Sequence, residues 1–262
     1  MALRPIPQDA PNPAIKRKMV AIASGKGGVG KTWFAISLSQ ALSRTGERTL
    51  LFDGDLGLAN VDIQLGLMPK HDISAVIAGK TTLAQAVTNF SDGAFDILAG
   101  RSGAGNLAAL PIQRLITLRN SLFSLADDYD RVILDLSAGV DRTVQTLASS
   151  AGINLVVTTD EPTSLTDAYS FIKLSEAERP GADMRIVINM AETKNTGQET
   201  YETLLKACRS FLGIEPPLAG IIRRDTKVRD SIRHQTAILT RYPASDAARD
   251  VEAIAERLQR TR

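Results

Sequence analysis

A glycine-rich loop that carries two lysines is the stretch of this sequence with the clearest chemistry. Residues 24–32 read Ser-Gly-Lys-Gly-Gly-Val-Gly-Lys-Thr, which matches the spacing G-x-x-x-x-G-K-[ST]. Glycines let the backbone N–H groups of such a loop turn inward on a polyphosphate. We expect Lys31 to reach the β- and γ-phosphates of a nucleotide and the Thr32 hydroxyl to bind Mg²⁺. The residues expected to contact the nucleotide are Gly25, Lys26, Gly27, Gly28, Val29, Gly30, Lys31, Thr32 and Trp33.

Three aspartates follow apolar runs and could serve the same chemistry. Asp53 and Asp55 are two residues apart, and such a pair beside a phosphate loop suits water positioning and contacts around Mg²⁺. A turn rich in Asp and Gly is the alternative interpretation. Asp135 ends a second apolar run, a pattern in which the carboxylate holds Mg²⁺ directly or through water. Phosphoryl transfer to water needs positioning and charge neutralisation rather than a nucleophilic side chain. The candidates for the catalytic role are Lys26, Lys31 and Asp55.

These residues need a scaffold that brings the ends of several strands together. Short apolar runs predict strands at 19–24, 49–53, 95–99, 131–135, 154–158, 184–189 and 218–222. Apolar residues at helical spacing predict helices near 33–44, 111–126, 143–150, 164–178 and 199–212. This alternation indicates a single α/β domain over residues 19–262, with a mainly parallel β-sheet flanked by helices. Residues 1–18 are rich in proline and basic side chains and are expected to form a flexible tail.

Composition narrows the classes of function. A chain of 262 residues with 44% hydrophobic side chains can bury one large core. Its one cysteine, Cys208, excludes an internal disulfide and a multi-cysteine metal site within the chain, so a buried structural thiol is expected. No apolar run is long enough to span a bilayer, which indicates a cytoplasmic protein. The net charge is +2 with basic excess at both ends, which suits either an anionic partner or ordinary solvated surface.

The second lysine of the loop gives the sequence a family resemblance. Lys26 to Thr32 reads K-G-G-x-G-K-[ST], which resembles the loop of the deviant Walker A ATPases of the MinD/ParA superfamily. The resemblance implies a P-loop NTPase fold, ATP and Mg²⁺ as ligands, and a homodimer that sandwiches ATP. It also implies that Lys26 contacts the nucleotide bound by the partner subunit.

The strand ends match motifs of the same family. The family's D-x-D matches Asp53 and Asp55, and the resemblance implies that Asp55 orients the attacking water. It makes Asp53 a structural residue or one linked to the metal through water. The family's D-x-x-A-G segment begins at Asp135 and ends at Gly139, which would let the backbone approach the γ-phosphate. The expected metal residues are Thr32, Asp53 and Asp135.

A later pair of segments is expected to bind the base. Asn189 matches a family asparagine that hydrogen-bonds the adenine edge, and residues 220–225, which include Arg223, are expected to close over the base. Two positions depart from the family pattern. Met190 stands where the family often has Arg, and Asp160 replaces the first proline of T-T-P-E-P-T.

Three runs point to one branch of the family. Residues 53–62, 95–100 and 161–169 resemble the flagellar-number regulators FlhG/FleN, relatives of MinD. The resemblance implies an ATP-binding and ATP-hydrolysing dimerising switch that regulates placement or number of flagella, with slow hydrolysis stimulated by a protein partner of the flagellar or positioning machinery. The D-Q-A activator motif of that branch is not evident, since Gln8-Asp9-Ala10 reverses its first two letters.

The C-terminal segment bears on membrane contact. Residues 247–258 carry an apolar stripe that is small and Ala-rich, whereas a membrane anchor favours bulky side chains. We therefore expect a helix packed on the domain, and peripheral contact with the inner face of the cell membrane is the alternative.

Two other classes of protein have the same glycine-rich loop and are the alternatives for this chain. A ParA-type DNA-partition ATPase would use the basic residues Arg223, Arg224, Lys227, Arg229 and Arg233 to bind DNA in the ATP state, and DNA is the less favoured partner. An iron–sulfur carrier would need several cysteines at its dimer interface, which the single Cys208 disfavours.

Overall fold

An eight-stranded sheet forms the centre of the protein. The computed structural model describes residues 13–57, 59–100 and 110–260. The strand order is β3-β4-β2-β5-β1-β6-β7-β8, and neighbours are parallel except β3 and β4. The predicted α/β fold with a mainly parallel sheet is therefore confirmed. The strands are β1 (Met19–Ser24), β2 (Thr49–Gly54), β3 (Thr88–Phe90), β4 (Phe95–Leu98), β5 (Arg131–Ala138), β6 (Ile153–Thr158), β7 (Asp183–Ala191) and β8 (Leu218–Arg223).

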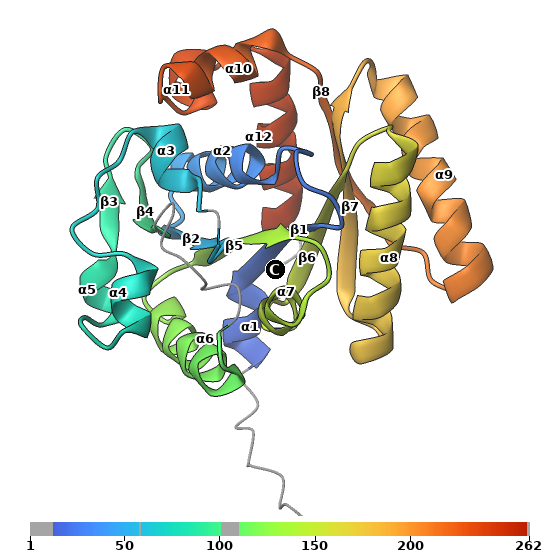
Figure 1. Cartoon of the computed structure of the whole chain (residues 1–262). Coiled ribbons are helices and arrows are strands. Elements are labelled where there is room, and N and C mark those ends of the chain that lie inside the picture. The colour runs from blue at the N-terminus through green and yellow to red at the C-terminus, as the bar shows by residue number, and fades with distance from the viewer. Residues whose placement is uncertain (1–12, 58, 101–109, 261–262) are drawn as a thin grey trace, which may run out of the picture.

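Helices cover both faces of this sheet (Figure 1). They are α1 (Pro13–Lys18), α2 (Lys31–Arg44), α3 (Val61–Leu65), α4 (Ile73–Ile77), α5 (Leu83–Ala86), α6 (Ile112–Ala126), α7 (Arg142–Ala148), α8 (Pro162–Glu178), α9 (Lys194–Leu212), α10 (Thr226–Arg233), α11 (Ile238–Arg241) and α12 (Asp246–Gln259). Successive residues of β1 alternate between two apolar clusters, as a pleated strand requires. One cluster includes Leu122 on α6 and Phe171 on α8, and the other includes Phe34 on α2 and Val251 on α12.

The predicted strands occur because their apolar runs are covered on both faces. All six residues of β1 are buried, and so are all six of β6. Two strands run at least two residues further than their apolar patterns predict. β5 continues to Ala138 and β7 continues to Ala191. Asn189 therefore lies on β7, two residues before the strand ends. The three-residue edge strand β3 carries no pattern strong enough to predict it.

The structure differs from the predicted tail at residues 13–18. This segment forms α1, whose backbone and side chains have partners on the domain. The Gly152 N–H donates to the Lys16 carbonyl at 2.8 Å, and Lys18 Nζ donates to the Ala126 carbonyl at 3.3 Å. These contacts hold α1 against the domain, although the composition of residues 13–18 predicts a flexible segment. Residues 1–12, including Gln8-Asp9-Ala10, lie outside the described residues.

The C-terminal helix α12 packs on the domain, as predicted. Its apolar stripe is at most 1% exposed and consists of Ala247, Ala248, Val251, Ile254, Ala255 and Leu258. A Cβ on Gly220 of β8 would lie 2.4 Å from Ile254 Cγ1, so the close approach of helix and strand requires glycine there. The stripe is thus not free to meet a membrane surface. Among the described residues, no helix combines the length and apolar character needed to cross a membrane.

Candidate functional site

The carboxyl ends of three central strands bring the glycine-rich loop and the predicted aspartates to one place. β5 lies between β1 and β2, and Asp135 on β5 is the register partner of Asp53 on β2. The Gly139 N–H donates to the Ser24 carbonyl at 2.9 Å, which joins the segment after β5 to the start of the loop. α2 begins at Lys31, so the loop leads directly into a helix N-terminus that favours anions.

Lys31 lies almost buried within the loop. The residue is 8% exposed, and its Nζ donates to Ser24 Oγ at 2.8 Å. Burial lowers the pKa of the Lys31 ammonium, and the carboxylates of Asp135 and Asp55 act in the opposite direction. The Lys31 ammonium has little contact with water, and the hydroxyl to which it donates is neutral. Its attraction to negatively charged phosphate oxygens would therefore be strong.

Gly30 sets the geometry between the loop and α2. It caps the helix with a φ of 89°, in the left-handed region that favours glycine. A Cβ at this position would also lie 2.4 Å from Asn189 Nδ2. Glycine is therefore required here both by backbone conformation and by the approach of β7.

Asp135 is a buried carboxylate with the properties of a cation ligand. It is 1% exposed, and among the described residues neither of its oxygens has a partner in hydrogen-bond geometry. Burial raises its pKa to about 7, while the neighbouring Thr32 hydroxyl and Lys31 ammonium act to lower it. Asp135 and Thr32 therefore supply oxygens that fit Mg²⁺, a cation that is usually held by one or two carboxylates with water and phosphate oxygens.

Asp53 has its oxygens engaged by backbone. It is fully buried and accepts the N–H groups of Asp55, Asn60 and Val61, each at 3.2 Å. Burial, followed by the charge of Asp135, raises the pKa of Asp53 to about 8. Of the two predicted roles, this geometry favours the structural one, because the carboxylate orders the loop that carries Asp55. Asp55 itself is half-buried and close enough to affect the pKa of both Lys31 and Asp135.

Lys26 points toward its own chain. Its Nζ lies 2.6 Å from Glu161 Oε2 and 2.8 Å from Thr163 Oγ1, two groups at the start of α8. The lysine and glutamate side chains are 35% and 62% exposed. The hydrogen bond and charge of Lys26 lower the pKa of Glu161. Sequence analysis used Glu161 and Thr163 as markers of a family branch and missed this contact.

An apolar cavity of about 270 Å³ lies beside the loop, on the side of β7 and β8. The residues that line it are Gly30, Trp33, Asn189, Met190, residues 222–226, Val228, Arg229 and Ile232. Asn189 Nδ2 donates to the Val29 carbonyl at 2.7 Å, and its Oδ1 accepts the Met190 N–H at 2.9 Å. These bonds fix the amide between the loop and the cavity. The predicted base residues therefore meet at one cavity next to the phosphate loop.

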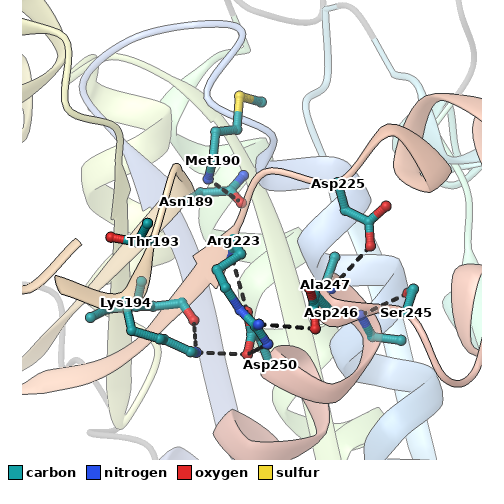
Figure 2. A network of polar contacts seen from close by, with 12 residues as sticks. Asn189, Met190, Thr193, Lys194, Arg223, Asp225, Ser245, Asp246, Ala247 and Asp250 are labelled. Carbon is teal, nitrogen blue, oxygen red and sulfur yellow. Dashed lines mark hydrogen bonds and ion pairs between the residues drawn. The ribbon is translucent and has the colours of Figure 1, made fainter. Parts of the chain in front are cut away.

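Arg223 lines this cavity but directs its guanidinium to α12 (Figure 2). Its Nε and Nη2 each donate to Asp250 at 3.0 Å, and its Nη1 lies 2.9 Å from Asp246 Oδ1. Lys194 Nζ lies 2.6 Å from the same Asp250 carboxylate. Sequence analysis missed Asp250 because the pattern of its helix indicates packing only.

Two arginines of the basic stretch and the cysteine, considered for other functions, are engaged or buried in the structure. Besides Arg223, the basic stretch includes Arg224, which lies 3.6 Å from Glu192 on the surface. Cys208 is fully buried, and burial raises the pKa of its thiol to about 11, as expected of a structural residue. Within the part of the chain that the structure describes, no group of three or more His, Cys, Asp and Glu side chains could hold a metal ion.

Comparison with known proteins extends the description of the site. A family model described as the CobQ/CobB/MinD/ParA nucleotide-binding domain matches residues 20–238. The chain is 34% identical to the antiactivator FleN of Pseudomonas aeruginosa, over 92% of this chain and 86% of that protein. It is 27% identical to the flagellum site-determining protein YlxH of Helicobacter pylori, over 91% and 80% of the two chains.

Solved structures repeat the fold. The septum site-determining protein MinD of Pyrococcus horikoshii, solved with Mg-ADP, aligns with a TM-score of 0.78 and 23% identity. The alignment covers 93% of this chain and 96% of that one. At this identity the likeness establishes the fold, and it does not by itself assign a ligand to this chain.

Proposed function

Because this chain belongs to the CobQ/CobB/MinD/ParA nucleotide-binding family, we propose that it is an ATP-hydrolysing switch that dimerises in its ATP state. Its output is regulation of the placement or number of flagella. The observation that carries the proposal is 34% identity to FleN over 92% of the chain, together with the site at the ends of β1, β2 and β5. YlxH, whose name refers to flagellum site determination, supports the same output.

The reaction assigns a role to each residue at the strand ends. Lys31 neutralises charge on the β- and γ-phosphates, as its buried ammonium suits. Thr32 and Asp135 would hold Mg²⁺, which would supply further charge neutralisation at the phosphates. Asp55 orients the attacking water, and Asp53 holds the loop on which Asp55 stands through three backbone N–H groups. No covalent intermediate is needed, since positioning and charge suffice for phosphoryl transfer to water.

Lys26 links nucleotide binding to dimerisation. The family resemblance implies that this lysine contacts the nucleotide of the partner subunit, whereas here it contacts Glu161 and Thr163 of its own chain. The ion pair is partly exposed, so solvent screens it and little free energy opposes its release. ATP offers Lys26 more negative charge than one carboxylate does. Exchange of partners by Lys26 thus accompanies assembly of the dimer.

The switch acts through a protein partner of the flagellar or positioning machinery, which stimulates slow hydrolysis. Peripheral membrane contact, if the function uses it, involves a surface other than the buried stripe of α12. The cytoplasm is the proposed location.

A purified-protein experiment tests the biochemical part of this proposal. Wild-type protein should bind ATP with Mg²⁺, and Lys31→Ala should lose roughly 10–100-fold in affinity, the amount expected for one charged hydrogen-bonding group. Loss of the gene in its native host should change the number or position of flagella. Normal flagellation in that strain would contradict the proposed output while leaving the ATPase assignment intact.

The DNA-partition alternative has less support. Arg223, which the alternative needs on a DNA-binding surface, is bonded to Asp250 and Asp246. An ATP-dependent mobility shift of DNA that weakens with salt would favour partition over flagellar control.

A further inference from the structure

We propose that Asp250 on α12 is a positioning residue for the nucleotide base, because it clamps the wall of the base cavity through Arg223. This inference rests on the proposed ATP site and goes beyond it, since it gives the C-terminal helix a role in base recognition. Asp250 does not line the cavity, so it acts through another residue and not by contact with the nucleotide.

The contacts of Asp250 are concentrated on one end of β8. Its carboxylate accepts the backbone N–H of Arg223 at 2.9 Å in addition to two guanidinium bonds at 3.0 Å. One aspartate therefore fixes both the main chain and the side chain of a residue that lines the cavity (Figure 2). The guanidinium and carboxylate lie in the two-pronged arrangement that holds orientation as well as charge.

Lys194 extends the clamp to α9. Its Nζ contacts Asp250 Oδ1 and donates to the Ile221 carbonyl, both at 2.6 Å. Lys194 begins α9, four residues after Met190, which also lines the cavity. The Arg224 N–H also donates to the Ala191 carbonyl at 2.8 Å. The segments after β7 and β8 are thus joined to each other and to α12.

A second link on α12 fixes Asp225, another residue that lines the cavity. Asp225 caps α10 by accepting the Lys227 N–H at 2.9 Å, and it also accepts the Ala247 N–H at 3.4 Å. The N-terminal half of α12 therefore contacts both Arg223 and Asp225, the first and last residues of segment 223–225. None of these contacts reaches the glycine-rich loop, so the clamp acts on the base end of the site.

The electrostatics explain why Asp250 has this position. Its side chain is 5% exposed. Burial raises the pKa of the carboxyl, but hydrogen bonds from Arg223 and Lys194 outweigh burial and lower it. The carboxylate is therefore ionised and shared by two cations. Removing its charge would leave the Arg223 guanidinium paired with Asp246, whose side chain is 55% exposed, and would loosen the cavity wall.

The test compares a ligand with a base and a ligand without one. Isothermal titration calorimetry measures ATP and inorganic tripolyphosphate binding to wild type, Asp250→Asn and Arg223→Gln in the full chain. Both variants should lose about tenfold in ATP affinity, the effect of removing one charge-assisted contact, and keep the tripolyphosphate affinity of wild type. If Asp250→Asn folds poorly, Arg223→Gln still tests the clamp, because it removes the other partner of the same ion pair.

Glu47→Gln is the matched control. Glu47 also forms a buried ion pair, 3.2 Å from Arg131, and Glu47 Oε1 accepts a hydrogen bond from Gln259 at the far end of α12. It should lose stability in thermal unfolding without a selective loss of ATP affinity.

Each outcome decides one claim. A selective loss of ATP affinity in both clamp variants supports the proposal. Equal ATP affinity in wild type and the clamp variants, or parallel losses for ATP and tripolyphosphate, would overturn the clamp and leave the proposed function standing. Failure of wild-type protein to bind ATP would overturn the proposed function and, with it, the clamp.

Discussion

Lys26 Nζ lies 2.6 Å from Glu161 Oε2, so the second lysine of the loop is held by the chain that carries it. The glutamate precedes α8, and Thr163 Oγ1 on the same turn accepts a second hydrogen bond from the lysine at 2.8 Å. To reach a nucleotide on a partner subunit, as we propose, Lys26 would have to turn away from Glu161 and Thr163. The intramolecular pair and the proposed dimer contact would therefore compete for one ammonium group.

This competition predicts opposite effects of two substitutions on dimerisation. Lys26→Gln should bind ATP as a monomer and lose the ATP-dependent dimer. Glu161→Gln should release Lys26 and lower the ATP concentration at half-dimerisation by about two- to fivefold, as expected for one solvent-screened ion pair. Sedimentation velocity across an ATP titration measures both effects.

A surface pair between Arg209 on α9 and Glu215 after the helix provides the control for Glu161→Gln. Glu215→Gln removes the partner of Arg209, which lies 2.8 Å away and is similarly exposed. Its dimerisation midpoint should match wild type. A Glu161→Gln midpoint equal to that of Glu215→Gln would show that the Lys26 pair does not restrain the dimer.

Trp33 should report nucleotide binding directly. It is the chain's single tryptophan, it follows Thr32, and it lines the base cavity. Nucleotide should therefore change the intrinsic fluorescence of wild-type protein. Lys31→Ala should need roughly 10–100-fold more ATP for the same change. Fluorescence that does not respond to saturating ATP in protein shown to bind it by calorimetry would place the nucleotide away from this cavity.

Gly30→Ala should impair both folding and binding. Its φ of 89° is strained for alanine, and the new Cβ would meet Asn189 Nδ2 at 2.4 Å. Gly46 offers a matched comparison, because its φ is 91° and nothing lies within 4 Å of an added Cβ. Gly46→Ala should cost about 1–2 kcal/mol of stability from backbone strain alone. Chemical denaturation should show a larger cost for Gly30→Ala, and equal costs would mean that Asn189 does not constrain the loop.

Cys208 should resist thiol reagents in the folded protein. The residue is fully buried and its pKa is raised to about 11 by burial, so roughly one thiol in a thousand is ionised at pH 8. Labelling followed by mass spectrometry should be slow in buffer and fast in urea. Rapid labelling of the folded protein would contradict the packing of α9 against the sheet.

Much of the scaffold could be predicted because its patterns are local. β1, the glycine-rich loop and α2 are continuous in sequence, and each has a period or motif of its own. The aspartates at the ends of β2 and β5 were predicted to meet because parallel strands share one carboxyl edge. β3 and the four-residue α11 carry too few residues for a period to show.

The polar partners could not be predicted for a different physical reason. Lys26 and Glu161 are 135 residues apart, and Arg223 and Asp250 are 27 apart. The chain has 31 basic and 29 acidic side chains, and no local pattern says which of them pair. Asp53 shows the same limit, since its partners are backbone N–H groups that become neighbours only when the loop after β2 folds back.

The oligomeric state of the purified chain with and without ATP is the most direct test of the central claim. Sedimentation velocity should find a monomer without nucleotide or with ADP, and a dimer with saturating ATP and Mg²⁺. Asp55→Ala should hold the dimer longer, because the residue proposed to orient water is absent. Wild-type protein and Asp55→Ala that both stay monomeric at saturating ATP would contradict the account of this chain as a dimerising ATP switch.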